Sequence, residues 1–218
     1  MKQIFSLAIC VASVATAFSQ SDKYQQAMET NVAALDTVHS SEEWDNIGNT
    51  FQRIADAEKT QWLPYYYASL AQVMSGYMIN NGQVSMNGDK TDPKADKAEE
   101  LLSKAEAMSK DNSEIYVVKK MIATLRMMAD PQTRWQTYGP AAAEALAKAK
   151  ELNPDNPRVY MLEGQDKFYT PEQFGGSKTE AKALFEEAMK KFDQFKPESN
   201  IAPKWGLHAT RYLYSQCN

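Results

Sequence analysis

The chain has 218 residues with 24 basic and 28 acidic side chains, a net charge of −4, and an apolar fraction of 43%. This length is sufficient for one domain with a well-buried core. The mildly acidic balance argues against nucleic acid or an anionic membrane surface as the main partner. Because Cys10 lies in the expected leader, only Cys217 would remain in the mature chain, which excludes an internal disulfide framework.

The N-terminus has the pattern of a secretory signal. Lys2 precedes an apolar stretch over residues 4–15, and Ala17 and Ser19 supply the small residues of a cleavage site. A membrane anchor is the alternative, but the stretch is shorter than the roughly 20 apolar residues of a spanning helix. We therefore predict a signal peptide over 1–19, a mature domain over 20–218 without a transmembrane segment, and export to the periplasm, either soluble or envelope-associated.

Helical periodicity continues through almost the whole remaining chain. Apolar residues recur every three or four positions, which predicts helices near 24–35, 44–54, 62–79, 98–108, 113–128, 142–152, 157–169 and 184–192, and a last one over 203–216. Turn-forming residues predict connections over 80–92, 130–140 and 170–177. No segment alternates like a strand, so the fold class is predicted to be all-α.

Two segments, 101–118 and 145–162, repeat one pattern 44 positions apart. Leu102 corresponds to Leu146, and each copy ends one helix, passes through a polar turn and begins the next helix. Such a repeat is typical of stacked helix pairs. We therefore predict a right-handed α-α superhelix of about four pairs, in which the proline-bounded connection over 130–140 lengthens the ideal repeat of about 34 residues.

Small residues at expected helix crossings, Ala149, Gly164 and Ala188, resemble those of tetratricopeptide repeats (TPR). Longer stretches, at 59–68, 112–116, 168–176 and 195–205, resemble a family of exported TPR-like proteins of Bacteroidetes bacteria. The resemblance covers nearly the whole mature chain. It implies a helical-repeat protein of the bacterial envelope with no established enzymatic activity, and it brings no catalytic residues.

The polar residues do not form a recognisable reaction centre. His39 and His208 are the two histidines, and neither has a second ligand at helical spacing, so solvated or capping roles are expected. Asp89, Asp92 and Asp96 suggest a calcium loop, but their spacing fits the start of a helix better. The prediction is therefore a chain that is not an enzyme, with no catalytic residues, no cofactor and no metal.

The densest aromatic cluster lies at the start of the helix expected over 62–79. Three consecutive tyrosines, residues 65–67, span about 200° of a helix, so they cannot all face one side. Tyr65, with Ser69 and Gln72, is predicted to face a groove and bind a partner. The alternative is that all three tyrosines pack between neighbouring repeats.

A second candidate is the loop over 170–178. Its consecutive glycines, Gly175 and Gly176, could turn backbone N–H groups toward an anion beside Lys178. The favoured interpretation is a tight turn in which Phe174 packs on the core. Whether this loop binds an anion is left open by the sequence.

The function predicted from these features is a binding or assembly scaffold. A protein or peptide segment would dock in a concave groove formed by the helices near 62–79, 113–128 and 157–169. The alternative is a small-molecule-binding accessory protein of an envelope uptake system, which would have an enclosed apolar pocket. Neither the partner nor the oligomeric state follows from the sequence.

Overall fold

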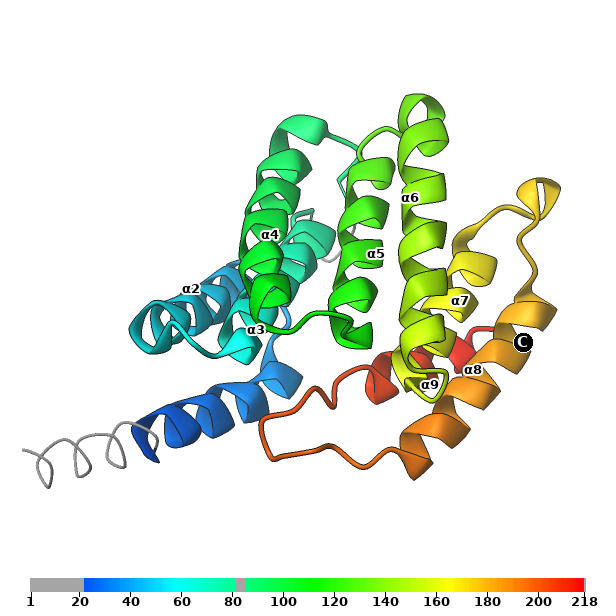
Figure 1. Ribbon diagram of the computed structural model, residues 1–218. Coiled ribbons are helices and arrows are strands. Elements are labelled where there is room, and N and C mark those ends of the chain that lie inside the picture. Colours follow the sequence, from blue (N-terminus) through cyan, green and yellow to red (C-terminus); the bar gives the residue numbers. More distant parts are fainter. Residues whose placement is uncertain (1–21, 81–84, 218) are drawn as a thin grey trace, which may run out of the picture.

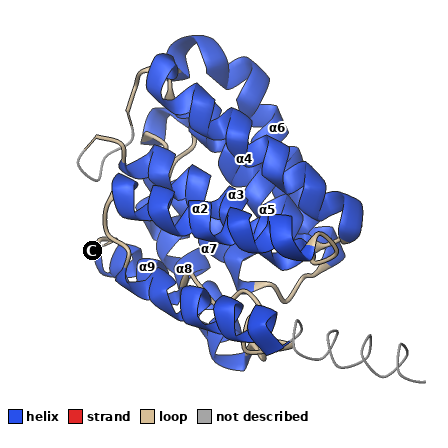
Figure 2. Cartoon of the chain, turned by 90° about the vertical axis from the view of Figure 1, so that its left-hand side faces the viewer, coloured by secondary structure: helices blue, strands red, loops and turns tan. Residues whose placement is uncertain are grey.

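The structure, a computed structural model, describes residues 22–80 and 85–217, and this part of the chain is helical without a β-strand (Figures 1 and 2). The helices span 22–34, Ser41–Glu58 (α2), Trp62–Met78 (α3), Gly88–Met108 (α4), Ser113–Met128 (α5), Pro131–Leu152 (α6), Pro157–Tyr169 (α7), Lys178–Gln194 (α8) and Leu207–Ser215 (α9), with short 3₁₀ turns at Leu35–Thr37 (η1) and Glu172–Phe174 (η2). The predicted all-α class is confirmed. The predicted signal peptide, residues 1–19, lies outside the described residues.

Polar side chains cap the first turns of several helices. The Ser40 hydroxyl accepts a hydrogen bond from the Glu43 N–H, and the Glu43 side chain accepts from the Ser40 N–H, which makes a capping box at the start of α2. At the two repeat turns the Asn112 and Asn156 side chains cap α5 and α7 by accepting hydrogen bonds from the N–H groups of Glu114 and Arg158. These side chains satisfy backbone donors that the first helical turn leaves unpaired.

The predicted connection over 130–140 is wrong, because α6 begins at Pro131 and continues through Pro140. Asp130 caps this helix through the Thr133 N–H, and a proline at the first helical position loses no hydrogen bond. The loop predicted over 80–92 is also too long, since Asn87 caps α4. The 44-residue spacing, from Ser113 to Pro157, therefore comes from the 16 residues of α5, the 22 residues of α6 and two short connections.

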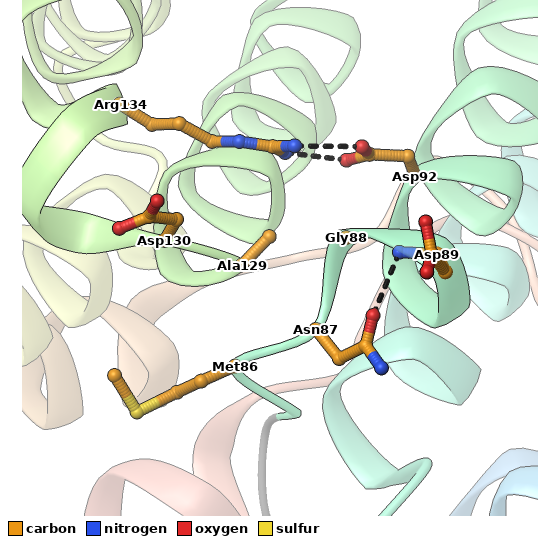
Figure 3. A pocket seen from close by; sticks show the side chains of 8 residues that line it. All are labelled: Met86, Asn87, Gly88, Asp89, Asp92, Ala129, Asp130 and Arg134. Carbon is orange, nitrogen blue, oxygen red and sulfur yellow. Dashed lines mark hydrogen bonds and ion pairs between the residues drawn. The ribbon is translucent and has the colours of Figure 1, made fainter.

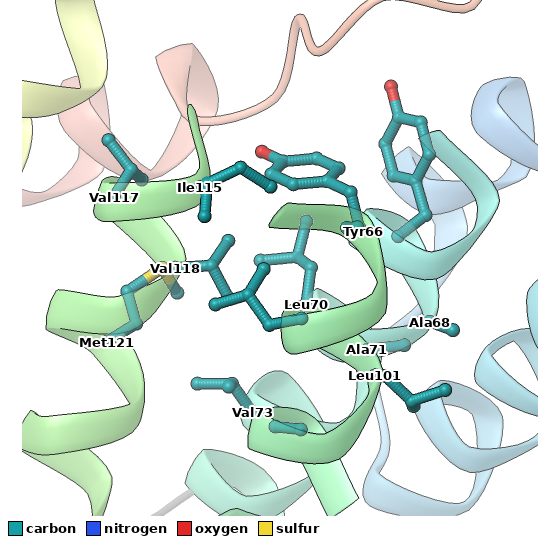
Figure 4. Packing of buried hydrophobic residues seen from close by; sticks show 14 of the residues in the cluster. Tyr66, Ala68, Leu70, Ala71, Val73, Leu101, Ile115, Val117, Val118 and Met121 are labelled. Atoms are coloured by element: carbon teal, nitrogen blue, oxygen red, sulfur yellow. The ribbon is translucent and has the colours of Figure 1, made fainter. Parts of the chain in front are cut away.

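Successive helices pack against one another along the chain. The most extensive contacts join α5 to α6, α2 to α3, α3 to α4 and α7 to α8, and α3 also contacts α5. Apolar side chains of α3 interleave with those of α5 in the core (Figure 4). By contrast, α6 and α7 have few contacts, although only four residues connect them. The array is therefore most open between these two helices.

The two sequence copies are also copies in three dimensions. Lys119 pairs with Glu106 at 2.6 Å, and Lys150 pairs with Glu163 at 2.8 Å. Residues 106 and 150, like 119 and 163, are one repeat spacing apart, and their charges are exchanged between the copies. In each copy the lysine lies 4.8 Å from the centre of a tyrosine ring. The contact geometry has thus been kept while the sign of each charge has changed.

Small residues allow the close helix approach that the sequence predicts. A Cβ atom on Gly164 would lie 2.5 Å from a ring carbon of Phe185, so α7 could not approach α8 this closely with any larger residue. Ala149 and Ala188 are fully buried. Larger side chains at these positions would force the helices apart.

Candidate functional site

The residues predicted to bind a partner lie inside the protein. Tyr65, Ser69 and Gln72 are 6%, 0% and 8% exposed, and the Ser69 hydroxyl donates to the Ala98 carbonyl of α4 at 2.7 Å. Helices α2, α4 and α5 all pack around α3, so none of its faces forms an open groove. The predicted exposure of Tyr65 is therefore wrong, and the tyrosines pack between repeats. The partner-binding role itself is not tested by the structure.

The same tyrosines take part in a buried polar network. The Tyr66 hydroxyl donates to Glu114 of α5 at 2.9 Å and accepts from the Trp205 Nε1–H at 2.9 Å. Arg158 of α7 approaches the Glu114 carboxylate at 3.1 Å and is itself fully buried. Burial and the nearby Glu114 carboxylate raise the pKa of Tyr66 well above its ordinary value. These contacts join three helices at their first turns.

Residues 195–206, here called the crossing segment, run past the first turns of α3 and α7 (Figure 1). The Tyr67 hydroxyl donates to the Ile201 carbonyl at 2.8 Å, and Arg158 donates to the Pro203 carbonyl. The rings of Phe195 and Trp205 lie 5.1 and 5.3 Å from the Arg158 guanidinium. This edge of the array is therefore occupied by the protein's own chain.

A hollow of about 450 Å³ lies between the starts of α4 and α6 (Figure 3). Two of its lining residues form an ion pair, in which Arg134 donates to both oxygens of Asp92, at 2.6 and 2.9 Å. The three aspartates considered for calcium do not converge there, because Asp96 pairs with Arg126 at 2.8 Å. In the residues that the structure describes, no group of three or more His, Cys, Asp or Glu is arranged to hold a metal ion.

A second hollow, of about 480 Å³, lies in the opening between α6 and α7. Its apolar wall consists of Ala143, Leu146 and Ala147, and its other lining residues are Lys150, Glu151, Glu163 and Asp166. Lys150 pairs with Glu163, and the buried Lys120 pairs with Asp166 at 2.6 Å. Both neighbouring lysines are therefore already neutralised, and the hollow offers little attraction to an anionic ligand.

The loop over 170–178 uses its glycine N–H groups internally. Gly175 has a φ of 92° and donates to the Glu172 carbonyl, while Gly176 donates to the Pro171 carbonyl. Phe174 is 73% exposed, so the expectation that it packs on the core is wrong. The two N–H groups considered for anion binding already have carbonyl partners in this loop.

An exposed aromatic surface lies where α7 ends beside α9. Tyr169 and Tyr212 are 64% and 61% exposed, and the neighbouring Tyr212 adds to the effect of partial burial in raising the pKa of Tyr169. His208 and Arg211, also exposed, precede Tyr212 on α9. We call Tyr169, His208, Arg211 and Tyr212 the α7–α9 face. Sequence reasoning missed it, although the spacing of His208 and Tyr212 by four residues already places them on one side of a helix.

A comparison with solved structures finds similarity over most of this chain. No family model matches the sequence, and no curated protein does. The fold and its surfaces define an all-α helical protein with repeated helix pairs. The HusA haemophore from Porphyromonas gingivalis is 36% identical in sequence, with a TM-score of 0.78 over 89% of this chain and 92% of that one. The chain therefore belongs to the same family as this haemophore.

This relationship corrects the predicted function. A haemophore is a haem-binding protein, which contradicts the predicted protein-binding scaffold and agrees better with the small-molecule alternative. The protein or peptide partner expected from the sequence has no support in the comparison. No helix in the described ranges is long and apolar enough to cross a membrane.

Proposed function

We propose that this protein binds haem. The observation that carries the proposal is the 36% identity with a haemophore over 89% of the chain. In this proposal the protein is a carrier or receptor of haem and not an enzyme. The ligand is cargo, and the chain supplies only its binding surface.

The side chains of the structure fit such a ligand. Haem is a flat apolar ring with two carboxylates and an iron that accepts histidine, tyrosine, methionine or cysteine as an axial ligand. Aromatic side chains stack on such rings, and arginine pairs with carboxylates. The α7–α9 face carries a histidine as a candidate iron ligand, tyrosine rings that can stack on the macrocycle, and an arginine that can pair with a carboxylate. Both hollows carry several carboxylates, whose charge would oppose the carboxylates of haem.

The cellular setting is also part of the proposal. The signal peptide over 1–19 would export a single TPR-like domain over 20–218 to the envelope of a Bacteroidetes bacterium, where it would serve haem uptake. Support comes from the sequence pattern of the N-terminus and from the source of the related haemophore, Porphyromonas gingivalis.

A titration of the purified protein with ferric haem tests the function. We expect a saturable change in the Soret absorption band with one haem per chain, and native mass spectrometry should show the same mass increment. Haem added to buffer and to an unrelated helical protein serves as control. A titration indistinguishable from these controls would show that the protein is not a haem carrier.

A further inference from the structure

We infer that the loop over 170–177, here called the docking loop, attaches the protein to a protein of the cell envelope. The Phe174 ring would enter an apolar pocket of that partner, and Glu172 would lie beside a cationic group at the rim of the pocket. This contact is separate from haem binding, and it does not involve the concave groove predicted from the sequence.

The docking loop holds a large apolar side chain in solvent. Phe174 is 73% exposed, on the single turn Glu172–Phe174 (η2) between α7 and α8. In Figure 1 the connection between these two helices extends away from the rest of the array. Phe168, earlier on α7, is partly buried against Phe185 of α8, with 6.4 Å between the ring centres. The fold therefore has an apolar site at the base of the loop and leaves Phe174 outside it.

Hydrogen bonds within the turn fix the place from which the ring extends. The N–H groups of Phe174 and Gly176 both donate to the Pro171 carbonyl, at 2.9 and 3.2 Å. The Gly175 N–H donates to the Glu172 carbonyl at 3.0 Å. Because these N–H groups are already paired, a partner would have to recognise the side chains of the loop and not its main chain.

The base of the docking loop is closed as well. The Ser177 N–H donates to the Lys167 carbonyl at 2.9 Å, and the Lys167 ammonium donates to the Gly175 carbonyl at 3.2 Å. A Cβ atom on Gly176 would lie 1.7 Å from the Thr170 carbonyl oxygen, so this closure requires glycine. A loop that is already ordered loses little conformational entropy on binding, which favours affinity.

The charge at the tip indicates the chemistry of the partner. Glu172 is exposed and is the only charged residue between Thr170 and Ser177. No cation of the described residues pairs with it, whereas Glu180 at the start of α8 pairs with Lys167 at 2.6 Å. Aromatic anchors in desolvated pockets carry much of the energy of protein interfaces. A pocket with a lysine or arginine at its rim therefore complements this tip.

A lipid bilayer fits the docking loop less well. Burial of one phenylalanine side chain strengthens binding by only about ten- to a hundredfold, and stable attachment to a membrane needs a second signal. Glu172 would also be repelled by anionic lipids.

A second copy of this chain is also a poor partner. The hollow between α6 and α7 has an apolar wall that could receive a ring, but Glu151, Glu163 and Asp166 also line it. These carboxylates would repel Glu172 of an approaching copy. A different protein is therefore the occupant that the charges favour.

Two variants with matched controls test the docking loop. Phe174→Ala removes the ring, and Glu172→Lys reverses the charge. Trp135→Ala and Glu144→Lys are the controls, because Trp135 is a 56% exposed aromatic residue and Glu144 an exposed glutamate, both on α6. Each protein is labelled with a fluorophore at its N-terminus. Binding is measured to envelope membranes of the source bacterium lacking its own copy of the gene, to the same membranes after protease treatment, and to protein-free vesicles of their extracted lipids.

We expect saturable binding of the unaltered protein to the intact membranes and none to the treated membranes or the vesicles. Phe174→Ala should bind about thirtyfold more weakly, as expected for an interface anchor. Glu172→Lys should bind about tenfold more weakly, because it places two like charges together. Both controls should match the unaltered protein, and circular dichroism of every variant should be unchanged.

Several results would overturn this inference. The unaltered protein could fail to bind the membranes, or Phe174→Ala could bind as tightly as the unaltered protein. Binding to the lipid vesicles that depends on Phe174 would identify a bilayer as the occupant. A dimer in sedimentation that Phe174→Ala dissolves would identify a second copy. None of these measurements uses haem, so the haem titration decides the proposed function independently.

Discussion

Two groups of tyrosines differ in almost every physical respect. Tyr66 and Tyr67 at the start of α3 are at most 1% exposed, and both hydroxyls are hydrogen-bonded. Tyr169 and Tyr212 are more than 60% exposed, and neither hydroxyl has a partner within the described residues. The dense cluster is part of the core, while the two dispersed residues form a surface. Aromatic density along the sequence is therefore a poor guide to a binding site when helices pack on every side.

The largest expected loss of stability follows from a change in the buried tyrosines, Tyr66 and Tyr67. Tyr66→Ala removes a fully buried ring and leaves Glu114 without one of its donors. We expect a loss of about 3–5 kcal/mol in the free energy of unfolding, measured by urea denaturation. Tyr66→Phe keeps the ring and should lose only about 1 kcal/mol. If both variants were as stable as the unaltered protein, this group would not be part of the core.

High pH should unfold the protein through the same residues. Burial raises the pKa of both Tyr66 and Tyr67 in the folded state, while the unfolded chain titrates at about 10. The stabilisation is therefore complete below about pH 10 and is lost as the pH rises further. Above this pH each tyrosine lowers the free energy of unfolding by up to about 1.4 kcal/mol per pH unit.

Melting temperatures from about pH 9 to 11.5 measure this loss, and phenolate absorption should appear together with unfolding. Tyr66→Phe should flatten the dependence, since one titrating group is removed. A melting temperature that stays constant over this range would contradict the assigned role of burial.

A smaller loss is expected where the interior has no room for a larger side chain. Ala149 is fully buried on α6, and its carbonyl accepts a hydrogen bond from the Ser113 hydroxyl. Ala149→Leu should lower stability by about 1–3 kcal/mol, measured by chemical denaturation, because overpacking displaces α5 or α7. Ala147→Leu, two residues earlier on an exposed position, is the matched control and should change stability by less than about 0.5 kcal/mol.

The smallest effect on stability is expected on the exposed group. Tyr212→Ala should change the free energy of unfolding by less than about 0.5 kcal/mol, because most of this residue is already exposed to solvent. Thermal melting of this variant beside Tyr66→Ala gives the direct comparison. A loss as large as that of Tyr66→Ala would place Tyr212 in the core and remove it from the proposed haem surface.

The all-α class and the repeat spacing could be predicted from the sequence because both depend on local patterns. The apolar periodicity and the pattern repeated at 101–118 and 145–162 marked the two turns, where Asn112 and Asn156 cap the following helices in the structure. The start of α6 was predicted wrongly because the prolines were interpreted as helix breakers. In the structure Pro131 starts this helix and Pro140 is tolerated within it. A proline can lie in a connection or within a helix, and only the surrounding packing decides between the two.

The candidate site was not predictable in the same way. Burial of Tyr65 depends on α4, which packs over it from about 30 residues away, as the hydrogen bond from Ser69 to Ala98 shows. Likewise, Tyr169 and Tyr212 are 43 residues apart in the sequence, and no local pattern joins them. The spacing of His208 and Tyr212 was visible, but a surface on two helices requires the fold.

The crossing segment also affects the order in which the protein folds. Hydrogen bonds from Tyr67 to Ile201 and from Trp205 to Tyr66 join positions more than 130 residues apart in the chain. During synthesis the hydroxyl groups of Tyr66 and Tyr67 on α3 gain these partners only after the late residues have been added. Helices α2 to α6 can therefore pair early, whereas the completed core depends on the last part of the chain to emerge.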